Sequence, residues 1–152
     1  THLMVVLYDY IDGKGLGLLV SSKAKLKISK FGGREPDIFF VPKPLFHLVG
    51  KNLFKGVPPL VIEILSPTNA DEDRVEKFRE YLGLGVSQYW IVDFPNRRIE
   101  IFELRRQPDG TSDYELIDSP SGDDLFHPAI FPGLEIPLAK IWPTEFEDRT
   151  DD

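Results

Sequence analysis

Residues 60–65 read LVIEIL, and this run decides the fold because it is apolar on both faces of a strand. Strands of this kind lie in the middle of a sheet that is covered on both sides, in an α/β or α+β domain. Glu63 interrupts the run with a carboxylate, which is costly to bury in its ionised form without a partner. We therefore expect a cation, a proton or hydrogen-bond donors beside Glu63.

A second carboxylate, Asp37, opens another apolar run at residues 38–41. Because side chains alternate along a strand, Asp37 shares a strand face with Phe39 and Val41. If the two strands are neighbours, the carboxylates of Asp37 and Glu63 can share one divalent ion. Hard oxygen ligands in a chain without cysteine favour magnesium or manganese.

Both acids also have structural explanations. A buried Glu63 could be neutralised by an arginine such as Arg34 or Arg79 and serve only the fold. The Pro-Asp pair that ends at Asp37 is an ordinary dipeptide for a turn or for the entry to a strand. The two acids together are more informative than either one alone.

The chain also indicates one clear helix at residues 71–82, which follows the strand that holds Glu63. It is entered through a turn at residues 66–69 and left at Gly83 and Gly85. Its core face is expected to hold Val75, Phe78 and Leu82.

Lys77 lies on this helix, four residues after Asp73. One interpretation is an exposed ion pair between these two residues, which contributes only a few tenths of a kcal/mol. The other is that Lys77 reaches the acids and acts with them in catalysis.

Apolar periodicity predicts the remaining elements. Residues 3–12 form a helix that the glycine-rich residues 13–17 end, and a chain that starts in mid-helix looks truncated. The strands are residues 18–28, 37–41, 60–65, 89–93 and 99–104, the last two joined by a turn at residues 95–96. Beyond residue 107, only residues 134–138 with Ile141 and Trp142 are expected to pack.

Length and composition favour one soluble domain with a single core, because the chain has 152 residues and no apolar run that could span a bilayer. We expect this domain at residues 1–143 and an acidic tail at residues 144–152. With no cysteine and no signal peptide, the expected location is the cytoplasm.

The net charge of -7 is divided unequally along the chain. Residues 1–56 hold nine basic and four acidic side chains, a net charge of +5, and residues 57–152 hold nine basic and 21 acidic ones, a net charge of -12. This distribution permits a nucleic-acid partner despite the overall charge. The candidate phosphate contacts are Lys23, Lys25, Lys27 and Arg34, which equally fit a solvated strand face.

Other kinds of site are disfavoured. Residues 13–17 lack the spacing of a phosphate-binding or dinucleotide-binding loop. The three histidines are far apart in sequence, and no Gly-x-Ser-x-Gly nucleophile motif is present. Aromatic residues within the predicted strands are assigned to the core rather than to base stacking.

Short motifs follow one another in a specific order along nearly the whole chain. They are REPDI at residues 34–38, VIEILSP at 61–67, Lys77, GVSQYWIVD at 85–93, FPGL at 131–134 and LAKIW at 138–142. In this order and spacing the chain resembles the Uma-two family of restriction-endonuclease-like proteins, a domain-of-unknown-function family within the PD-(D/E)XK nuclease superfamily.

This resemblance implies a restriction-endonuclease-like fold, with a mixed central sheet flanked by helices. It also implies that Asp37, Glu63 and the main-chain carbonyl of Ile64 bind Mg²⁺ or Mn²⁺. The superfamily pattern has lysine where this chain has Leu65, so its role passes to Lys77, as in the family. Family members usually begin with a further helix and strand bearing another acid, so the active centre of this chain would be incomplete.

The implied activity is that of an endodeoxyribonuclease, which hydrolyses DNA phosphodiester bonds with a metal ion. Asp37, Glu63 and Lys77 are then catalytic, and Asp73 and Asp93 support them, although a turn cap explains Asp93 better. A homodimer is suggested by the way such nucleases cut two strands. The alternatives are an inactive nuclease fold that mediates protein interactions and a metal-dependent phosphohydrolase with a substrate other than DNA.

Overall fold

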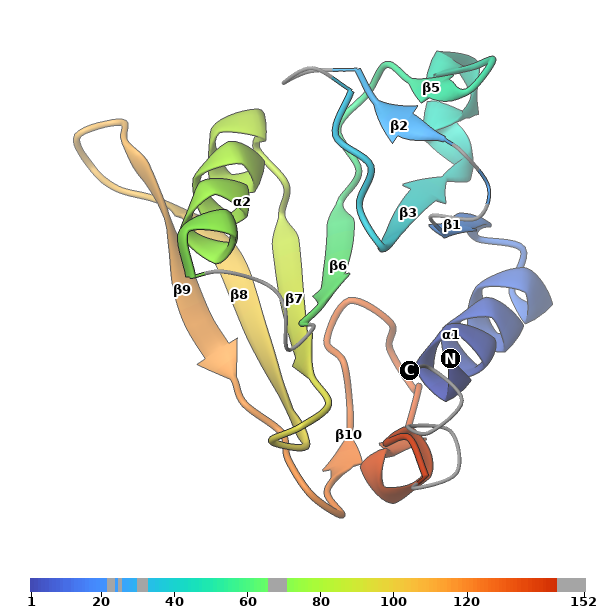
Figure 1. Cartoon of the computed structure of the whole chain (residues 1–152). Helices are drawn as coiled ribbons and strands as arrows, with labels where there is room; N and C mark the ends of the chain where they lie inside the picture. Colours follow the sequence, from blue (N-terminus) through green and yellow to red (C-terminus); the bar gives the residue numbers. More distant parts are fainter. Residues whose placement is uncertain (22–23, 25, 30–32, 66–70, 145–152) are drawn as a thin grey trace.

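The structure is a computed structural model that describes residues 1–21, 24, 26–29, 33–65 and 71–144 (Figure 1). Lys23, Lys25, the predicted turn at residues 66–69 and residues 145–152 of the predicted tail lie outside the described residues. The division into a domain and a tail therefore stays a prediction. Within the described residues, no helix has both the length and the apolar character needed to cross a membrane.

A mixed sheet of six strands forms the centre of the molecule (Figure 1). Only its two middle strands are parallel, and α2 (Asp71–Leu84) connects them. The other neighbouring strands are antiparallel. The order across the sheet is β1 (Gly17–Ser21), β3 (Ile38–Pro42), β6 (Leu60–Ile64), β7 (Gln88–Asp93), β8 (Arg98–Arg106) and β9 (Ser112–Asp118). This architecture confirms the predicted fold class.

One face of the sheet is covered by α1 (His2–Gly13) and by the C-terminal elements. The predicted helical spacing is correct, because Leu3, Leu7 and Ile11 point into the core and the Thr1 side chain caps the first turn. The C-terminal elements are β10 (Leu125–Phe126), β11 (Ile136–Pro137) and the short 3₁₀ helix η3 (Leu138–Lys140). They contribute further side chains to this core.

The opposite face is covered by α2 and by a small sheet. The small sheet holds β2 (Lys27–Ile28), β5 (Leu53–Phe54) and β4 (Val49–Gly50), and a 3₁₀ helix, η2 (Lys43–Leu48), precedes β4. Phe39 and Val61 of the central strands pack into this second core. Because side chains alternate along a strand, Asp37 and Glu63 lie on the same face as Phe39 and Val61. Both acids are therefore on the α2 side of the sheet.

The single strand predicted at residues 18–28 is wrong. β1 pairs antiparallel with β3 in the central sheet, whereas β2 pairs parallel with β5 in the small sheet. Apolar and polar residues alternate only partly over this stretch. Such a pattern cannot show that its two ends have different strand partners.

The predicted core face of α2 is wrong at Val75, which is 48% exposed. Tyr81 is fully buried instead, one helical turn beyond Lys77. The helix also runs past Gly83 and ends at Leu84, and Gly85 follows with a φ of 91°. Its N–H donates back to the carbonyls of Tyr81 and Leu82, as in a glycine C-cap.

The expectation of little packing beyond residue 107 is also wrong. β9 forms a hairpin with β8, and Tyr114 of β9 is buried, as are Phe126 and Phe131 farther along the chain. Only one residue of β9 is buried, so its sequence has no strong alternation of apolar and polar residues. The hairpin with β8, rather than the pattern of β9 itself, stabilises this strand.

Candidate active site

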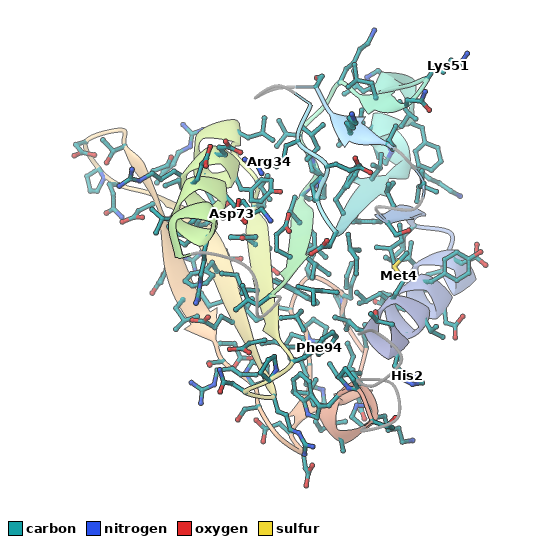
Figure 2. All side chains as sticks on the ribbon, in the orientation of Figure 1. His2, Met4, Arg34, Lys51, Asp73 and Phe94 are labelled. Carbon is teal, nitrogen blue, oxygen red and sulfur yellow. The ribbon has the colours of Figure 1, made fainter. Side chains whose placement is uncertain are left out.

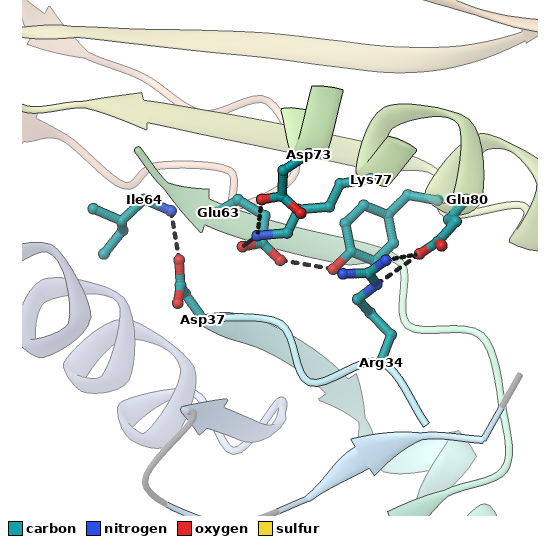
Figure 3. Close-up of polar contacts among 8 residues, drawn as sticks. Arg34, Asp37, Glu63, Ile64, Asp73, Lys77 and Glu80 are labelled. Carbon is teal, nitrogen blue, oxygen red and sulfur yellow. Dashed lines mark hydrogen bonds and ion pairs between the residues drawn. The ribbon is translucent and has the colours of Figure 1, made fainter. Parts of the chain in front are cut away.

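Asp37 and Glu63 lie on neighbouring antiparallel strands. Ile38 of β3 pairs with Ile62 of β6, and the same register continued by one residue places Asp37 opposite Glu63. The Ile64 main-chain N–H donates to Asp37 Oδ2 at 2.7 Å, which holds the half-buried Asp37 side chain beside β6 (Figure 3). The two acids that the sequence singled out are thus brought together.

Glu63 is only 4% exposed, and both of its carboxylate oxygens have hydrogen-bond donors. The Tyr81 hydroxyl donates to Oε1 at 2.6 Å, and Lys77 Nζ lies 3.2 Å from Oε2. Both donors come from α2, which packs over this face of the sheet. The buried carboxylate therefore has the partners that its position requires.

The surroundings of Glu63 favour its protonated form despite these donors. Burial and the nearby negative charge of Asp37 raise the pKa of Glu63, and Tyr81 and Lys77 lower it, so that with all these interactions together the pKa is about 7. A carboxyl group with this pKa is partly protonated at neutral pH. A cation between the two acids would restore its charged form.

Lys77 bridges two carboxylates rather than one. Its ammonium lies 3.2 Å from Glu63 Oε2 and 3.3 Å from Asp73 Oδ2, and its side chain is only 19% exposed (Figure 3). Partial burial by itself lowers the pKa of Lys77, but its interactions with Glu63 and Asp73 outweigh this effect and raise the pKa above its usual value. Lys77 is therefore protonated at neutral pH, and the interpretation as a simple surface pair with Asp73 is incomplete.

Neither of the arginines considered as partners of Glu63 takes that role in the described part of the chain. Arg34 pairs with Glu80 of α2, and its Nε donates to Glu80 Oε2 at 2.6 Å. Arg79 is exposed. Charge neutralisation at Glu63 comes instead from Lys77, whose position on the next helix made it a candidate.

Tyr81 is the residue of the site that sequence reasoning missed. It stands four residues after Lys77 and so lies on the same side of α2. That spacing was visible in the sequence, but a tyrosine in an amphipathic helix is ordinarily a core residue. Its contact with Glu63 depends on how α2 is rotated against the sheet.

Asp93 is the last residue of β7, next to the turn that leads into β8. Its two carboxylate oxygens accept hydrogen bonds from the main-chain and side-chain nitrogens of Asn96, at 3.2 and 2.8 Å. This is the turn-capping arrangement that was expected as the better explanation. The described contacts of Asp93 do not connect it to Glu63 or Asp37.

The donor set fits a hard divalent cation. Asp37 and Glu63 are carboxylates on neighbouring strands, and Asp37 is close enough to raise the pKa of Glu63. Among the described residues, no group of three or more His, Cys, Asp or Glu side chains could hold a metal ion. Magnesium is often bound by one or two carboxylates with water as the other ligand, so two acids are sufficient.

Comparisons with known proteins bear on the fold and the family. No curated protein matches the chain. Among solved structures, it is similar to "a putative nuclease belonging to DUF820" from Anabaena variabilis ATCC 29413. The TM-score is 0.67, with 17% sequence identity over 93% of this chain and 76% of that chain, so this likeness shows the fold alone.

A family match covers most of the sequence and confirms the resemblance. Residues 1–139 match the family Uma2, which is described as "Putative restriction endonuclease". The matched residues include Asp37, Glu63 and Lys77. This chain belongs to the Uma2 family.

Proposed function

We propose that this protein is an endonuclease that hydrolyses DNA phosphodiester bonds with the help of Mg²⁺ or Mn²⁺. The main support for the proposal is that Asp37 lies opposite Glu63, and that Lys77 contacts Glu63, on the α2 side of the sheet. Membership of a family described as restriction endonucleases supports a nuclease. The chain shares its fold with a protein described as "a putative nuclease", which is consistent with this proposal.

Asp37 and Glu63 are the proposed metal-binding side chains, together with the main-chain carbonyl of Ile64. Such an ion, when bound, lowers the pKa of a coordinated water molecule and polarises the phosphoryl group. Glu63 has one oxygen directed to Tyr81 and the other to Lys77, so its orientation is set before any ligand arrives. Asp37 is oriented by the Ile64 amide in the same way.

Lys77 is proposed to stabilise the negative charge that develops on the phosphate. A protonated amine cannot accept a proton from the attacking water, so the raised pKa of Lys77 favours electrostatic stabilisation over general-base catalysis. Asp73 would support this role by holding the ammonium at 3.3 Å. Asp93 is assigned to its turn.

DNA and a second copy of the chain are the proposed partners. Lys27 is exposed on β2 and is a candidate phosphate contact, together with Lys23 and Lys25. Arg34 contributes less to such contacts, because its guanidinium pairs with Glu80. A homodimer would allow both strands to be cut, and sedimentation that shows only a 17.3 kDa species at micromolar concentration would exclude it. Cytoplasmic location stays a prediction.

The proposal is tested first by manganese binding, measured by calorimetry at pH 8. We expect saturable binding to the unaltered protein and its loss in Glu63→Gln, because the amide removes the anionic ligand while retaining the size of the side chain. Glu76→Gln is the matched control, since Glu76 is an exposed residue on α2. Binding of equal strength in all three proteins would refute the assignment of the site.

A further inference from the structure

Two adjacent residues of α2 reach the two segments that hold the acids. Tyr81 donates its hydroxyl hydrogen to Glu63 Oε1 at 2.6 Å. Glu80 pairs with Arg34, which stands three residues before Asp37 (Figure 3). One turn of this helix is therefore connected to both sides of the candidate active site.

Tyr81 restricts the side chain of Glu63. The tyrosine is 1% exposed, so its ring is fixed by packing and its hydroxyl has little freedom to move. Its ring lies 5.1 Å from that of Tyr89 on β7, which fixes the ring from the sheet side. A rigid donor of this kind limits Glu63 to orientations in which Oε1 faces α2.

Glu80 restricts the segment that leads to Asp37. Arg34 is held on both sides, because its main-chain carbonyl accepts from the Ile28 N–H at 2.9 Å and its side chain pairs with Glu80. Only Glu35 and the buried Pro36 separate Arg34 from Asp37, and proline limits the backbone of this short connection. The position of Arg34 thus influences where Asp37 enters β3.

We propose that Tyr81 and Glu80 are positioning residues for the candidate metal site, Tyr81 for Glu63 and Glu80, through Arg34, for Asp37. This inference rests on the proposed function. It assigns to α2 a role beyond covering the sheet: the helix sets the orientation of the two acids toward each other. Removing a hydrogen-bond partner of a metal ligand typically weakens metal binding by roughly 10- to 100-fold.

Matched control variants distinguish the proposed positioning role of Tyr81 and Glu80 from a general contribution to the stability of the fold. Tyr114 is also a buried tyrosine, and its hydroxyl donates to the Val86 carbonyl at 2.8 Å, away from both acids. Glu100 also forms an ion pair with an arginine, Arg74 of α2, on the β8 side of the helix. Tyr114→Phe and Glu100→Gln therefore remove the same kinds of interaction without touching the segments of Asp37 and Glu63.

The first measurement is manganese affinity at pH 8 for these four variants, with thermal unfolding of each. We expect Tyr81→Phe to weaken binding by about 10- to 100-fold and Glu80→Gln by a smaller factor, while both controls bind like the unaltered protein. Thermal stability should fall to similar extents within each matched pair. Equal affinities in all five proteins would overturn the inference and leave the metal site itself intact.

The second measurement does not depend on a metal ion. The Ile64 amide donates to Asp37, so its hydrogen exchange reports on the position of Asp37. The carboxyl carbon shift of Glu63 reports its contact with Tyr81 in the same way. We expect faster Ile64 exchange in Glu80→Gln but not in Glu100→Gln, and a changed Glu63 shift in Tyr81→Phe but not in Tyr114→Phe. If the unaltered protein binds no manganese, the proposed metal site is refuted. If, in addition, Ile64 exchange is unchanged in Glu80→Gln and the Glu63 shift is unchanged in Tyr81→Phe, the positioning role is overturned as well.

Discussion

The proposed role of Glu63 as a metal ligand requires an ionised carboxylate, but its position in the folded protein favours the protonated form. The residue is buried in a strand and faces another acid, and both raise its pKa, which is about 7 once its hydrogen-bond donors are included. Tyr81 and Lys77 offset only part of this cost. A nearby cation would favour the charged form of this carboxylate.

This conflict predicts how stability depends on pH. Between pH 4.5, the ordinary pKa of a glutamate, and pH 7, folded Glu63 keeps a proton that the unfolded chain has lost. The free energy of unfolding should therefore fall as pH rises through this window, by roughly 3 kcal/mol for this group. Urea unfolding with a chelator present at pH 5 and pH 8 measures the fall.

Glu63→Gln supplies the comparison for this experiment, because the amide does not titrate. We expect the variant to lack the part of the pH dependence that Glu63 causes, and to be more stable than the unaltered protein at pH 8. Parallel stability curves for the two proteins would show that Glu63 is ionised in the folded state throughout.

At the scale of the element, α2 shows why apolar spacing misidentified a helix face. The side chains that contact the sheet include Arg74 and Lys77, which pair with Glu100 and Glu63, as well as Tyr81. Val75 is exposed to solvent although it is apolar. A helix that partners acids in a sheet carries basic residues on its inner face, and a hydrophobic pattern cannot identify that face.

The pairing of β1 with β3 depends on the absence of a side chain at Gly17. A Cβ atom there would lie 2.2 Å from the Val41 carbonyl oxygen, a main-chain atom that cannot move without breaking the strand pair. We expect Gly17→Ala to destabilise the protein by about 1–3 kcal/mol, measured by chemical unfolding.

Gly13→Ala is the control for this substitution. A Cβ atom at Gly13 would have no neighbour within 4 Å, and the residue lies at the end of α1, where alanine is a better helix former. Its stability should equal or slightly exceed that of the unaltered protein. A cost at Gly13 as large as that at Gly17 would argue against the close approach of β1 and β3.

At the scale of the molecule, exposed lysines from the basic part of the sequence lie around η2 and the small sheet. The four exposed lysines are Lys43 on η2, Lys27 on β2, Lys51 between β4 and β5 (labelled in Figure 2), and Lys55 directly after β5. Between residues 24 and 62 the sequence holds only two acids, Glu35 and Asp37. This region is connected to the site through the bridge between Ile28 and Arg34.

If DNA is the substrate, this basic region should contribute to its affinity. We expect Lys51→Glu with Lys55→Glu to weaken binding of a short duplex on the order of 10-fold at low salt, because each lysine that contacts a phosphate releases counterions. Fluorescence anisotropy with Ca²⁺ in place of Mg²⁺ measures this affinity without cleavage.

A second pair of charge reversals controls for net charge. Arg106 and Lys140 are exposed and lie outside the basic region, so Arg106→Glu with Lys140→Glu changes the total charge by the same amount. We expect this variant to bind DNA nearly as well as the unaltered protein. Equal losses in both variants would mean that overall charge, and not this region, determines the affinity.

The sequence alone was sufficient to predict both α-helices and the central strands, and to propose Asp37, Glu63 and Lys77 as candidate site residues. This was possible because burial imposes a local period on a strand or helix, and a carboxylate such as Glu63 stands out against an apolar run. The motif order was also sufficient to recognise the family.

The contacts between side chains could be known only from the folded structure. Tyr81 and Glu63 are 18 residues apart and Arg34 and Glu80 are 46 apart, and their contacts depend on the rotation of α2 and on the register of β3 with β6. β9 and the two partners of residues 18–28 were missed for the same reason. Local periodicity specifies which face of an element is buried, but polar pairing depends on elements that are distant in sequence.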